Sequence, residues 1–188
     1  MFHLGGARGK TAPVVTALAE MTIRIIKAKA EDAAAIANVH ISSWHAAYEN
    51  IVPASVLAAQ SVERLEAFWQ DALNKGSSDI LVAVAPADEI VGFVSFGPCR
   101  TGNASGELYA IYARPDYFRT GTGRLLWEAA RQHLEYAGFH TIIALVITNN
   151  HAARRFYENV GFSLVPDSAS VFTWEGEVLD DVCYEYRI

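Results

Sequence analysis

The chain has 188 residues, of which 52% are hydrophobic and 19% are charged, and its formal net charge is −6. This length suits one domain with a sizeable core, and the apolar share excludes an intrinsically disordered chain. The 13 Gly, 6 Pro and 2 Cys exclude a collagen-like or disulfide-rich scaffold. No run of Lys and Arg is present, so no nucleic-acid partner is expected. An acidic balance commonly serves solubility, and it also suits cationic substrates such as amines.

The first 20 residues differ from the rest of the chain. They contain three Gly and Pro13 without a clear period, so we expect a leader or tail at 1–20 and one domain at 21–188. A signal peptide is the less favoured alternative, because the apolar run after Lys10 is short and interrupted. No apolar run is long enough to predict a membrane span. Cys99 and Cys183 show no metal-ligand spacing, so we expect reduced thiols, no metal and a cytoplasmic protein.

Hydrophobic periodicity predicts the elements of the first half. Alternation around Arg24 predicts a strand, and the acidic pair Glu31 and Asp32 favours the start of a helix. Pro53 and Gly76 interrupt or end the helical pattern that follows. In chain order, we expect a strand at 22–26, helices at 31–48, 55–59 and 61–76, a hairpin of strands at 80–84 and 90–96, and a loop at 98–106.

The second half has the pattern of a crossover connection. Alternation at 107–113 predicts a strand with Leu108, Ala110 and Tyr112 on one face, and Pro115 stops it. The remaining expected elements are a helix at 121–136 capped by Gly138, an apolar strand at 141–147, a helix at 150–159, and two or three antiparallel strands. This order predicts an α/β (α+β) fold, in which a mixed, mostly antiparallel sheet carries helices on both faces.

The turn at 118–124, between a predicted strand and a predicted helix, is the most informative segment. Gly121 and Gly123 allow backbone N–H groups to converge, and the unpaired N–H groups and dipole of the helix favour an anion there. Arg119 and Arg124 add cations that suit phosphate oxygens. The pattern is neither a dinucleotide fingerprint nor a P-loop. By itself it therefore allows either a pyrophosphate site or a plain tight turn.

The segment from Glu107 onwards resembles the core of the GNAT superfamily of N-acetyltransferases. That family joins a strand, a Pro, the turn Q/R-x-x-G-x-G/A, a helix and a strand to the pattern N-x-x-A-x-x-x-Y-x-x-x-G-F. In the turn, Phe118 stands at the Gln/Arg position of the family, and Arg119 follows it. The first strand and helix, from Met21, are also typical of the family. The final pattern is complete here as Asn150, Ala153, Tyr157, Gly161 and Phe162.

The resemblance implies acetyl-coenzyme A as acyl donor and a sheet that splays apart between its fourth and fifth strands. The pantetheine arm would pair with the backbone of the fourth strand, Asn150 would contact the same arm, and the pyrophosphate would lie on the Gly-rich turn. The residues implied in donor binding are Ile111, Tyr112, Ala113, Arg119, Thr120, Gly121, Thr122, Gly123, Arg124 and Asn150.

Acetyl transfer to an amine requires a neutral nitrogen, which a base or a desolvating pocket must supply. Glu107 is the candidate base, because many family members place an acid at the start of this strand; the alternative is an exposed strand-end carboxylate. A backbone N–H near Tyr112 would stabilise the oxyanion. The family pattern implies that Tyr157 protonates or contacts the departing sulfur, whereas without that pattern a core tyrosine is the simpler interpretation.

Trp44 and Tyr48 are candidates for an acceptor pocket. They are four residues apart, so they share one helix face, although aromatic residues at this spacing more often belong to a core. The resemblance implies direct attack, in a ternary complex, by a primary amine of a small molecule, a protein N-terminus or a lysine. It also suggests a homodimer, by analogy alone. The alternative is a non-catalytic sensor or scaffold domain that binds an acyl-CoA.

Overall fold

The computed structural model describes residues 22–188, so the predicted leader at 1–20 lies outside the described residues. The helices are α2 (Ala33–Tyr48), α3 (Ala54–Ala58), α4 (Val62–Lys75), α5 (Thr122–Tyr136) and α6 (His151–Asn159), with short 3-10 turns η1 (Ala30–Asp32), η2 (Pro86–Asp88) and η3 (Pro115–Tyr117). The strands are β1 (Arg24–Lys27), β2 (Asp79–Ala85), β3 (Glu89–Pro98), β4 (Gly106–Ala113), β5 (Thr141–Ile147), β6 (Ser163–Leu164), β7 (Ser170–Trp174) and β8 (Glu177–Arg187).

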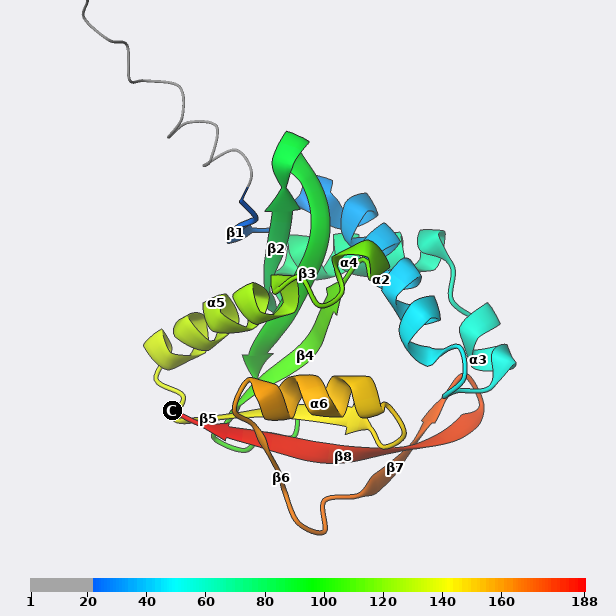
Figure 1. The fold of residues 1–188 in the computed structure, drawn as a ribbon, viewed down its shortest axis with the longest axis vertical. Coiled ribbons are helices and arrows are strands. Elements are labelled where there is room, and N and C mark those ends of the chain that lie inside the picture. The colour runs from blue at the N-terminus through cyan, green and yellow to red at the C-terminus, as the bar shows by residue number, and fades with distance from the viewer. Residues whose placement is uncertain (1–21) are drawn as a thin grey trace, which may run out of the picture.

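The strands of the described chain form one mixed sheet in the order β1-β2-β3-β4-β5-β8-β6, and β7 pairs with β8 (Figure 1). The pair β4–β5 is parallel, and the other pairs are antiparallel. A parallel pair needs a crossover, and α5 provides it between β4 and β5. The predicted fold class is therefore confirmed.

Local sequence signals explain where the helices begin and end. The Ser61 hydroxyl accepts a hydrogen bond of 3.2 Å from the Arg64 backbone N–H and caps α4, and Gly76 ends that helix in the left-handed conformation, with φ of 60°. The Asn150 side chain caps α6 by accepting a 3.0 Å bond from the Ala153 N–H. Gly138 follows α5 with φ of 90°, as its predicted capping role requires.

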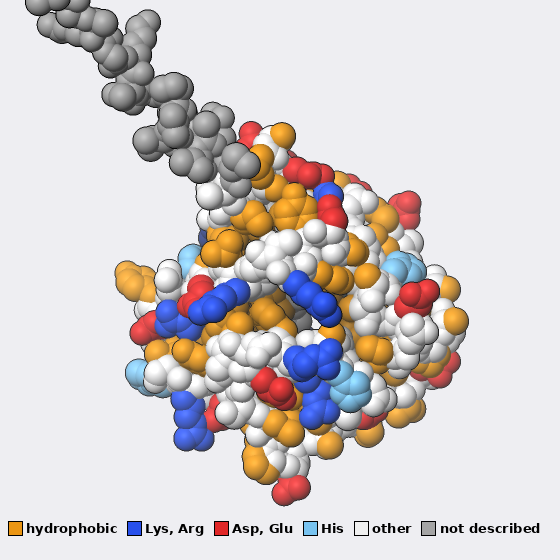
Figure 2. Space-filling view, viewed as in Figure 1, with side chains coloured by type: hydrophobic (Ala, Val, Ile, Leu, Met, Phe, Trp, Pro, Cys, Tyr) orange, Lys and Arg blue, Asp and Glu red, His pale blue; other side chains and the backbone are white. Residues whose placement is uncertain are grey.

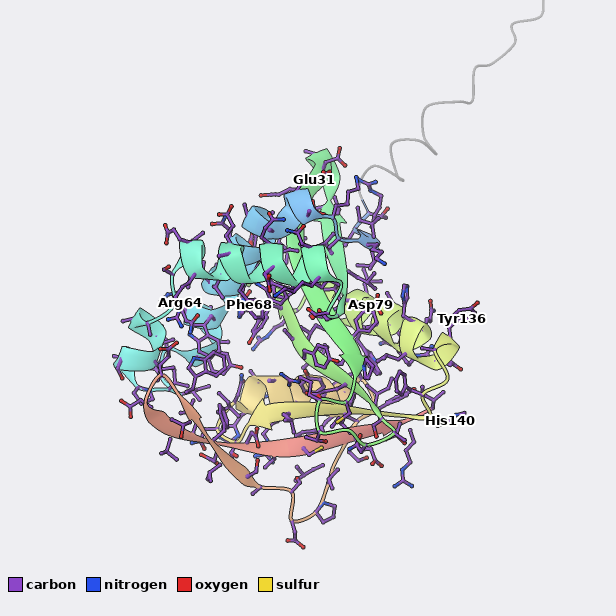
Figure 3. All side chains as sticks on the ribbon, turned by 180° about the vertical axis from the view of Figure 1, so that it is seen from behind. Glu31, Arg64, Phe68, Asp79, Tyr136 and His140 are labelled. Atoms are coloured by element: carbon purple, nitrogen blue, oxygen red, sulfur yellow. The ribbon has the colours of Figure 1, made fainter. Side chains whose placement is uncertain are left out.

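Helices cover both faces of the sheet, as the element order predicts. From α5 and α6, Leu126, Trp127 and Tyr157 pack against one face. From α2 and α4, Ile36 and Trp69 pack against the other face, and the view from behind shows α4 crossing β2 and β3 (Figure 3). Each face thus has its own apolar core, and the sheet between them carries the site.

One prediction about β4 is wrong. The pairing of β3 with β4 shifts register between Ser95 and Phe96, which leaves Tyr109 unpaired in a β-bulge. As a result Leu108 packs into the core beneath α5 and α6, whereas Ala110 and Tyr112 pack against the core beneath α2 and α4. These three side chains therefore do not share one face, because the extra residue reverses the alternation along the strand.

Candidate functional site

A cleft opens where β4 and β5 separate. The two strands pair only over residues 106–108 and 142–144. Beyond them β4 runs on to Ala113, and no described strand pairs with that edge of its backbone. The resulting cleft has a volume of about 1110 Å³ and is the central hollow in Figure 2. The predicted splay is confirmed.

The end of α2, the edge of β4, the turn before α5, the end of β5 and α6 line this cleft. Most of the predicted donor-binding residues lie in it. Thr120 and Thr122 do not line it: their hydroxyl oxygens are 2.9 Å apart, and Thr122 is fully buried. The predicted site residues that line the cleft are Tyr48, Ile111, Tyr112, Ala113, Arg119, Gly121, Gly123, Arg124, Asn150 and Tyr157.

The turn before α5 takes its shape from two residues with positive φ. Arg119 has φ of 61° and Gly121 has φ of 93°, and Gly121 is the N-cap of α5 without a side chain to bond the first turn. The first N–H groups of a helix have no partner within it. Because no side-chain cap occupies them here, they are available to an anion at the cleft wall.

Gly123 brings α5 and α6 close together. A Cβ at this position would lie 3.2 Å from Cε2 of Phe156 on α6. A Cβ there would therefore force the Phe156 ring, which also lines the cleft, to shift by a few tenths of an ångström. The G-x-G pattern thus serves two separate needs: Gly121 provides the left-handed turn, and Gly123 provides the close approach.

Arginines surround the opening of the cleft. Arg119 and Arg124 belong to the predicted turn, and Arg155 comes from α6. Among residues 22–188, no ion pair or side-chain hydrogen bond engages any of these three guanidinium groups. Figure 2 shows Lys and Arg side chains on several sides of the hollow. Arg155 was not predicted, because its only signal is its place two residues before Tyr157 in the helix.

The backbone edge of β4 is held in place from α2. The buried Ser43 hydroxyl donates a hydrogen bond to the carbonyl oxygen of Ala113, the last residue of the strand. Ser43 also lines the cleft, as do the small side chains Ala46 and Ala47. A helix with small residues on one face can lie close to a strand edge. Sequence reasoning missed this contact, because a serine inside a helix gives no distinctive signal.

Three tyrosines meet in the cleft. Burial raises the pKa of Tyr157, and the nearby Tyr48 hydroxyl raises it further. Burial also raises the pKa of Tyr48, but hydrogen bonding to the side chains of Tyr112 and Asn150 opposes the increase. The pKa of Tyr112 lies well above its ordinary value, chiefly because of burial. All three hydroxyl groups are therefore protonated at neutral pH.

Glu107 lies outside the residues that line the cleft. Its side chain is 2% exposed, so the alternative of an exposed strand-end carboxylate is wrong. The carboxylate accepts hydrogen bonds of 2.9 Å from the backbone N–H and from Nε of Arg100, and it also contacts Nη2 of that residue. The Arg100 guanidinium lies 4.8 Å from the centre of the Tyr109 ring. Sequence reasoning missed Arg100, because it lies in the irregular loop after β3.

Only one of the two predicted acceptor residues lines the cleft. Trp44 and Tyr48 do share a helix face, with ring centroids 4.3 Å apart. Tyr48 lines the cleft, whereas Trp44 is 2% exposed and packs with Val56 and Leu179 in a separate apolar cluster. Trp44 therefore supports the ring of Tyr48 from behind, and only Tyr48 is in a position to touch a ligand in the cleft.

His40 was not predicted and stands behind Tyr112. The two rings are stacked, with centroids 4.9 Å apart, and Nδ1 of His40 accepts a 3.2 Å hydrogen bond from the indole N–H of Trp69. Burial lowers the pKa of His40 to about 4. The imidazole is consequently neutral at pH 7, with its proton on Nε2, because Nδ1 is the acceptor. This arrangement fixes the Tyr112 ring on the side away from the cleft.

Comparison with known proteins agrees with this geometry. The sequence model of the acetyltransferase (GNAT) family matches residues 40–162. The N-acetyltransferase YuaI of Bacillus subtilis is 35% identical over 130 residues, which cover 68% of this chain and 73% of that protein. A mycothiol acetyltransferase of Actinosynnema mirum is 31% identical over 71% of this chain and 41% of its own length. The chain belongs to the GNAT family and is an N-acetyltransferase.

Solved structures share the fold. The PaiA N-acetyltransferase of Thermoplasma acidophilum, solved with coenzyme A, superposes with a TM-score of 0.75 at 20% identity, over 89% of this chain and all of that one. YncA of Salmonella typhimurium, solved with acetyl-CoA, gives a TM-score of 0.67 at 21% identity, over 88% and 94% of the two chains. Related folds of this kind thus hold coenzyme A or its acetyl ester.

Two features are absent from residues 22–188. No cluster of His, Cys, Asp and Glu is arranged to hold a metal ion. No helix in the same range is long and apolar enough to cross a membrane.

Proposed function

We propose that this N-acetyltransferase takes its acetyl group from acetyl-coenzyme A and passes it to a primary amine by direct attack in a ternary complex. The observation that carries the proposal is the cleft itself. A strand edge, a helix N-terminus and three arginines converge there, and none of them has a partner within residues 22–188. These groups match an extended amide-containing arm that ends in a pyrophosphate. The strand edge, the helix N-terminus and the arginines all face the same cleft, so a single donor molecule can contact all of them.

The donor would lie with its pantetheine arm along residues 111–113 and beside Asn150, and with its pyrophosphate on residues 119–124. A backbone N–H of β4 near Tyr112 would then meet the oxyanion, and Tyr157 would contact the sulfur. Glu107 as general base remains a prediction. Its carboxylate is buried and bonded to Arg100, so in this arrangement it faces that guanidinium rather than the cleft.

For the acceptor we favour a small-molecule amine over a protein N-terminus or lysine. The support comes from relatives: besides the mycothiol acetyltransferases, an L-methionine sulfoximine/L-methionine sulfone acetyltransferase of Pseudomonas paraeruginosa is 28% identical over 60% of this chain and 66% of its own length. The net charge of −6 also suits a cationic acceptor. The cytoplasmic location and the homodimer remain predictions.

The test combines binding and turnover. Calorimetry should show that coenzyme A and acetyl-coenzyme A bind, and ligand at about 100 times its Kd should stabilise the fold by about 2.7 kcal/mol. Thiol release from acetyl-coenzyme A is then followed with a panel that includes L-methionine sulfone, a diamine and a short peptide. Release above the rate of hydrolysis with one amine supports transfer. Binding without release from any amine would favour the acyl-CoA sensor, and absence of binding would refute both.

A further inference from the structure

The cleft is lined by side chains from both faces of the sheet. On β5, Ala144 and Val146 pack into the core beneath α5 and α6, whereas Ile147 packs with Trp44 in the cluster beneath the end of α2. Side chains alternate between the two faces along a strand. Leu145, two residues before Ile147, therefore points to the α2 side, and it lines the cleft.

β4 presents an aromatic ring to the same face. Tyr109 and Glu107 both contact Arg100, so they point to the same side of the strand, whereas Leu108 between them packs into the core beneath α5 and α6. The parallel pairing of β4 with β5 ends at Leu108. Tyr109 and Leu145 are therefore the first residues of their strands beyond the paired segment, and they flank the point where the strands separate.

The end of α2 supplies the third wall of this opening, because Ala47 and Ile51 line the cleft there. Just beyond the ends of α2 and β5, Asn50 and Asn149 add amide groups, which carry no charge. The opening, which we name the α2-side mouth, is thus framed by four uncharged and largely apolar side chains: Ala47, Ile51, Tyr109 and Leu145.

Leu145 is exposed at this mouth although its strand is otherwise well covered. Its side chain is 45% exposed, whereas Ala144 and Val146 on either side of it are buried. An apolar side chain in a concave wall favours a ligand that removes it from water. The phosphates of the proposed donor belong at the turn before α5 and beside Arg155, on the other face of the sheet. The α2-side mouth is therefore left for the acceptor.

The charged groups near the mouth already have partners. The Glu107 carboxylate, on the same face of β4, is buried and bonded to Arg100. The Arg100 guanidinium in turn lies 4.8 Å from the centre of the Tyr109 ring. A second ammonium group on an acceptor would lose hydration beside Leu145, and it would meet a carboxylate that is already paired and a ring that already carries a cation.

We propose that the α2-side mouth is the acceptor subsite and that it selects a primary amine whose remaining chain is apolar and uncharged. This inference rests on the proposed function and narrows its acceptor to one class of small-molecule amine. Leu145 and Tyr109 determine the specificity, because an alkyl chain that covers them buries apolar surface. A diamine of the same length places its second charge against these side chains and is disfavoured.

The test uses analogues that need no turnover. Coenzyme A is alkylated on its sulfur to give –S–CH2–CO–NH–R, in which R is methyl, propyl, pentyl or 5-aminopentyl and takes the place of the acceptor chain. Calorimetry with the full chain measures each Kd. From methyl to pentyl, each added CH2 should tighten binding about threefold. The 5-aminopentyl analogue should bind about tenfold more weakly than the pentyl analogue.

Two variants of one residue locate the effect. Leu145→Asn keeps a side chain of similar size but makes it polar, so it should reduce the advantage of pentyl over methyl about fivefold. Leu145→Met stays apolar and should keep that advantage, which guards against a folding defect. The matched control is Leu164→Asn on β6, because Leu164 is 43% exposed and lies outside the cleft; it should leave the advantage unchanged.

The failure of this inference differs from failure of the proposed function. Equal affinity for all four analogues, or tighter binding of 5-aminopentyl than of pentyl, would overturn the apolar acceptor subsite and leave donor binding intact. An equal loss of the pentyl advantage in Leu145→Asn and Leu164→Asn would remove Leu145 from the subsite. If neither coenzyme A nor the methyl analogue binds the unaltered chain, the proposed function is refuted as well.

Discussion

At the scale of single residues, the cleft depends on backbone angles that most side chains avoid. Arg119 and Gly121 both have positive φ, at 61° and 93°. A residue with a Cβ loses roughly 1–2 kcal/mol in this region, so Arg119 stores strain that a glycine there would relieve. The side chain of Arg119 lines the cleft, and an anionic ligand beside it would offset that cost.

A comparison of Gly121 with Gly138 distinguishes the effect of backbone strain on stability from the effect of the turn on coenzyme A binding. Gly121 and Gly138 have nearly the same φ, 93° and 90°, and a Cβ at either meets no atom within 4 Å. Gly121→Ala and Gly138→Ala should therefore each lower the free energy of unfolding by about 1 kcal/mol in urea titrations. Only Gly121→Ala should weaken coenzyme A binding measured by calorimetry, because only that turn shapes the cleft. Equal affinity in the two variants would argue against a phosphate site at this turn.

His40 makes stability depend on pH. Burial lowers its pKa from 6.5 to about 4, so between these values the unfolded chain binds a proton that the folded chain does not. Its contribution is complete above pH ~6.5 and is lost as the pH falls towards ~4. His40→Gln keeps an acceptor for Trp69, and the stability gap between the native chain and this variant should shrink by about 2–3 kcal/mol across that range.

Urea unfolding at several pH values measures this gap. His45→Gln, on the exposed side of the same helix, is the matched control for removal of a histidine that is not buried. A gap for His40→Gln that stays constant from pH 7 to 4 would contradict a neutral, buried imidazole behind Tyr112.

At the scale of elements, one residue at the start of α6, Asn150, both caps the helix and lines the cleft. Asn150 caps the helix with its side-chain oxygen, and it lines the cleft together with Tyr48. Asn150→Asp keeps the cap, and a carboxylate also suits the positive end of the helix dipole. Asn150→Ala removes the cap and should lower the free energy of unfolding by about 1 kcal/mol relative to Asn150→Asp.

The two variants should have similar turnover but different stability. Both remove the amide N–H groups of a residue that lines the cleft, so both should lower kcat for thiol release, although only Asn150→Ala loses helix stability. Chemical denaturation and the thiol assay measure the two effects independently. Full activity in Asn150→Asp would mean that the amide nitrogen has no part in the reaction.

The elements were largely predictable, because their signals are local. Ser61 caps the start of α4 and Gly76 caps its end, as their residue types predict, and the Gly-rich turn lies at the start of α5. The bulge at Tyr109 was not predictable, because its alternating sequence reads the same with or without an extra unpaired residue. Nor was the meeting of Tyr48 with Asn150, since two residues 102 positions apart meet only through tertiary packing.

At the scale of the whole molecule, distant segments join to hold the end of α2. Arg64 on α4 bonds Glu175 at 2.8 Å, and Ser55 on α3 bonds Glu177 at 3.0 Å, across 111 and 122 residues. The Trp44 ring lies 5.1 Å from the ring of Trp174 on the same β7–β8 hairpin. The helices beside Tyr48 and the last hairpin therefore form one packed unit around the cleft.

Charge is distributed unevenly over this molecule, and the distribution predicts salt-dependent binding. The chain carries a net charge of −6, yet three arginines that pair with no group in the described part of the chain line the cleft. Arg155→Gln should weaken coenzyme A binding about fivefold at ~0.1 M salt, where charges act over about 10 Å. At ~1 M salt, where that distance is about 3 Å, the difference should nearly vanish. Arg187→Gln is the control, because that side chain is 82% exposed, pairs with Glu185 and lies outside the cleft. Calorimetry of the unaltered chain and of both variants at the two salt concentrations measures six affinities. Equal weakening by the two variants would mean that the net charge of the chain, rather than the position of Arg155, governs coenzyme A binding.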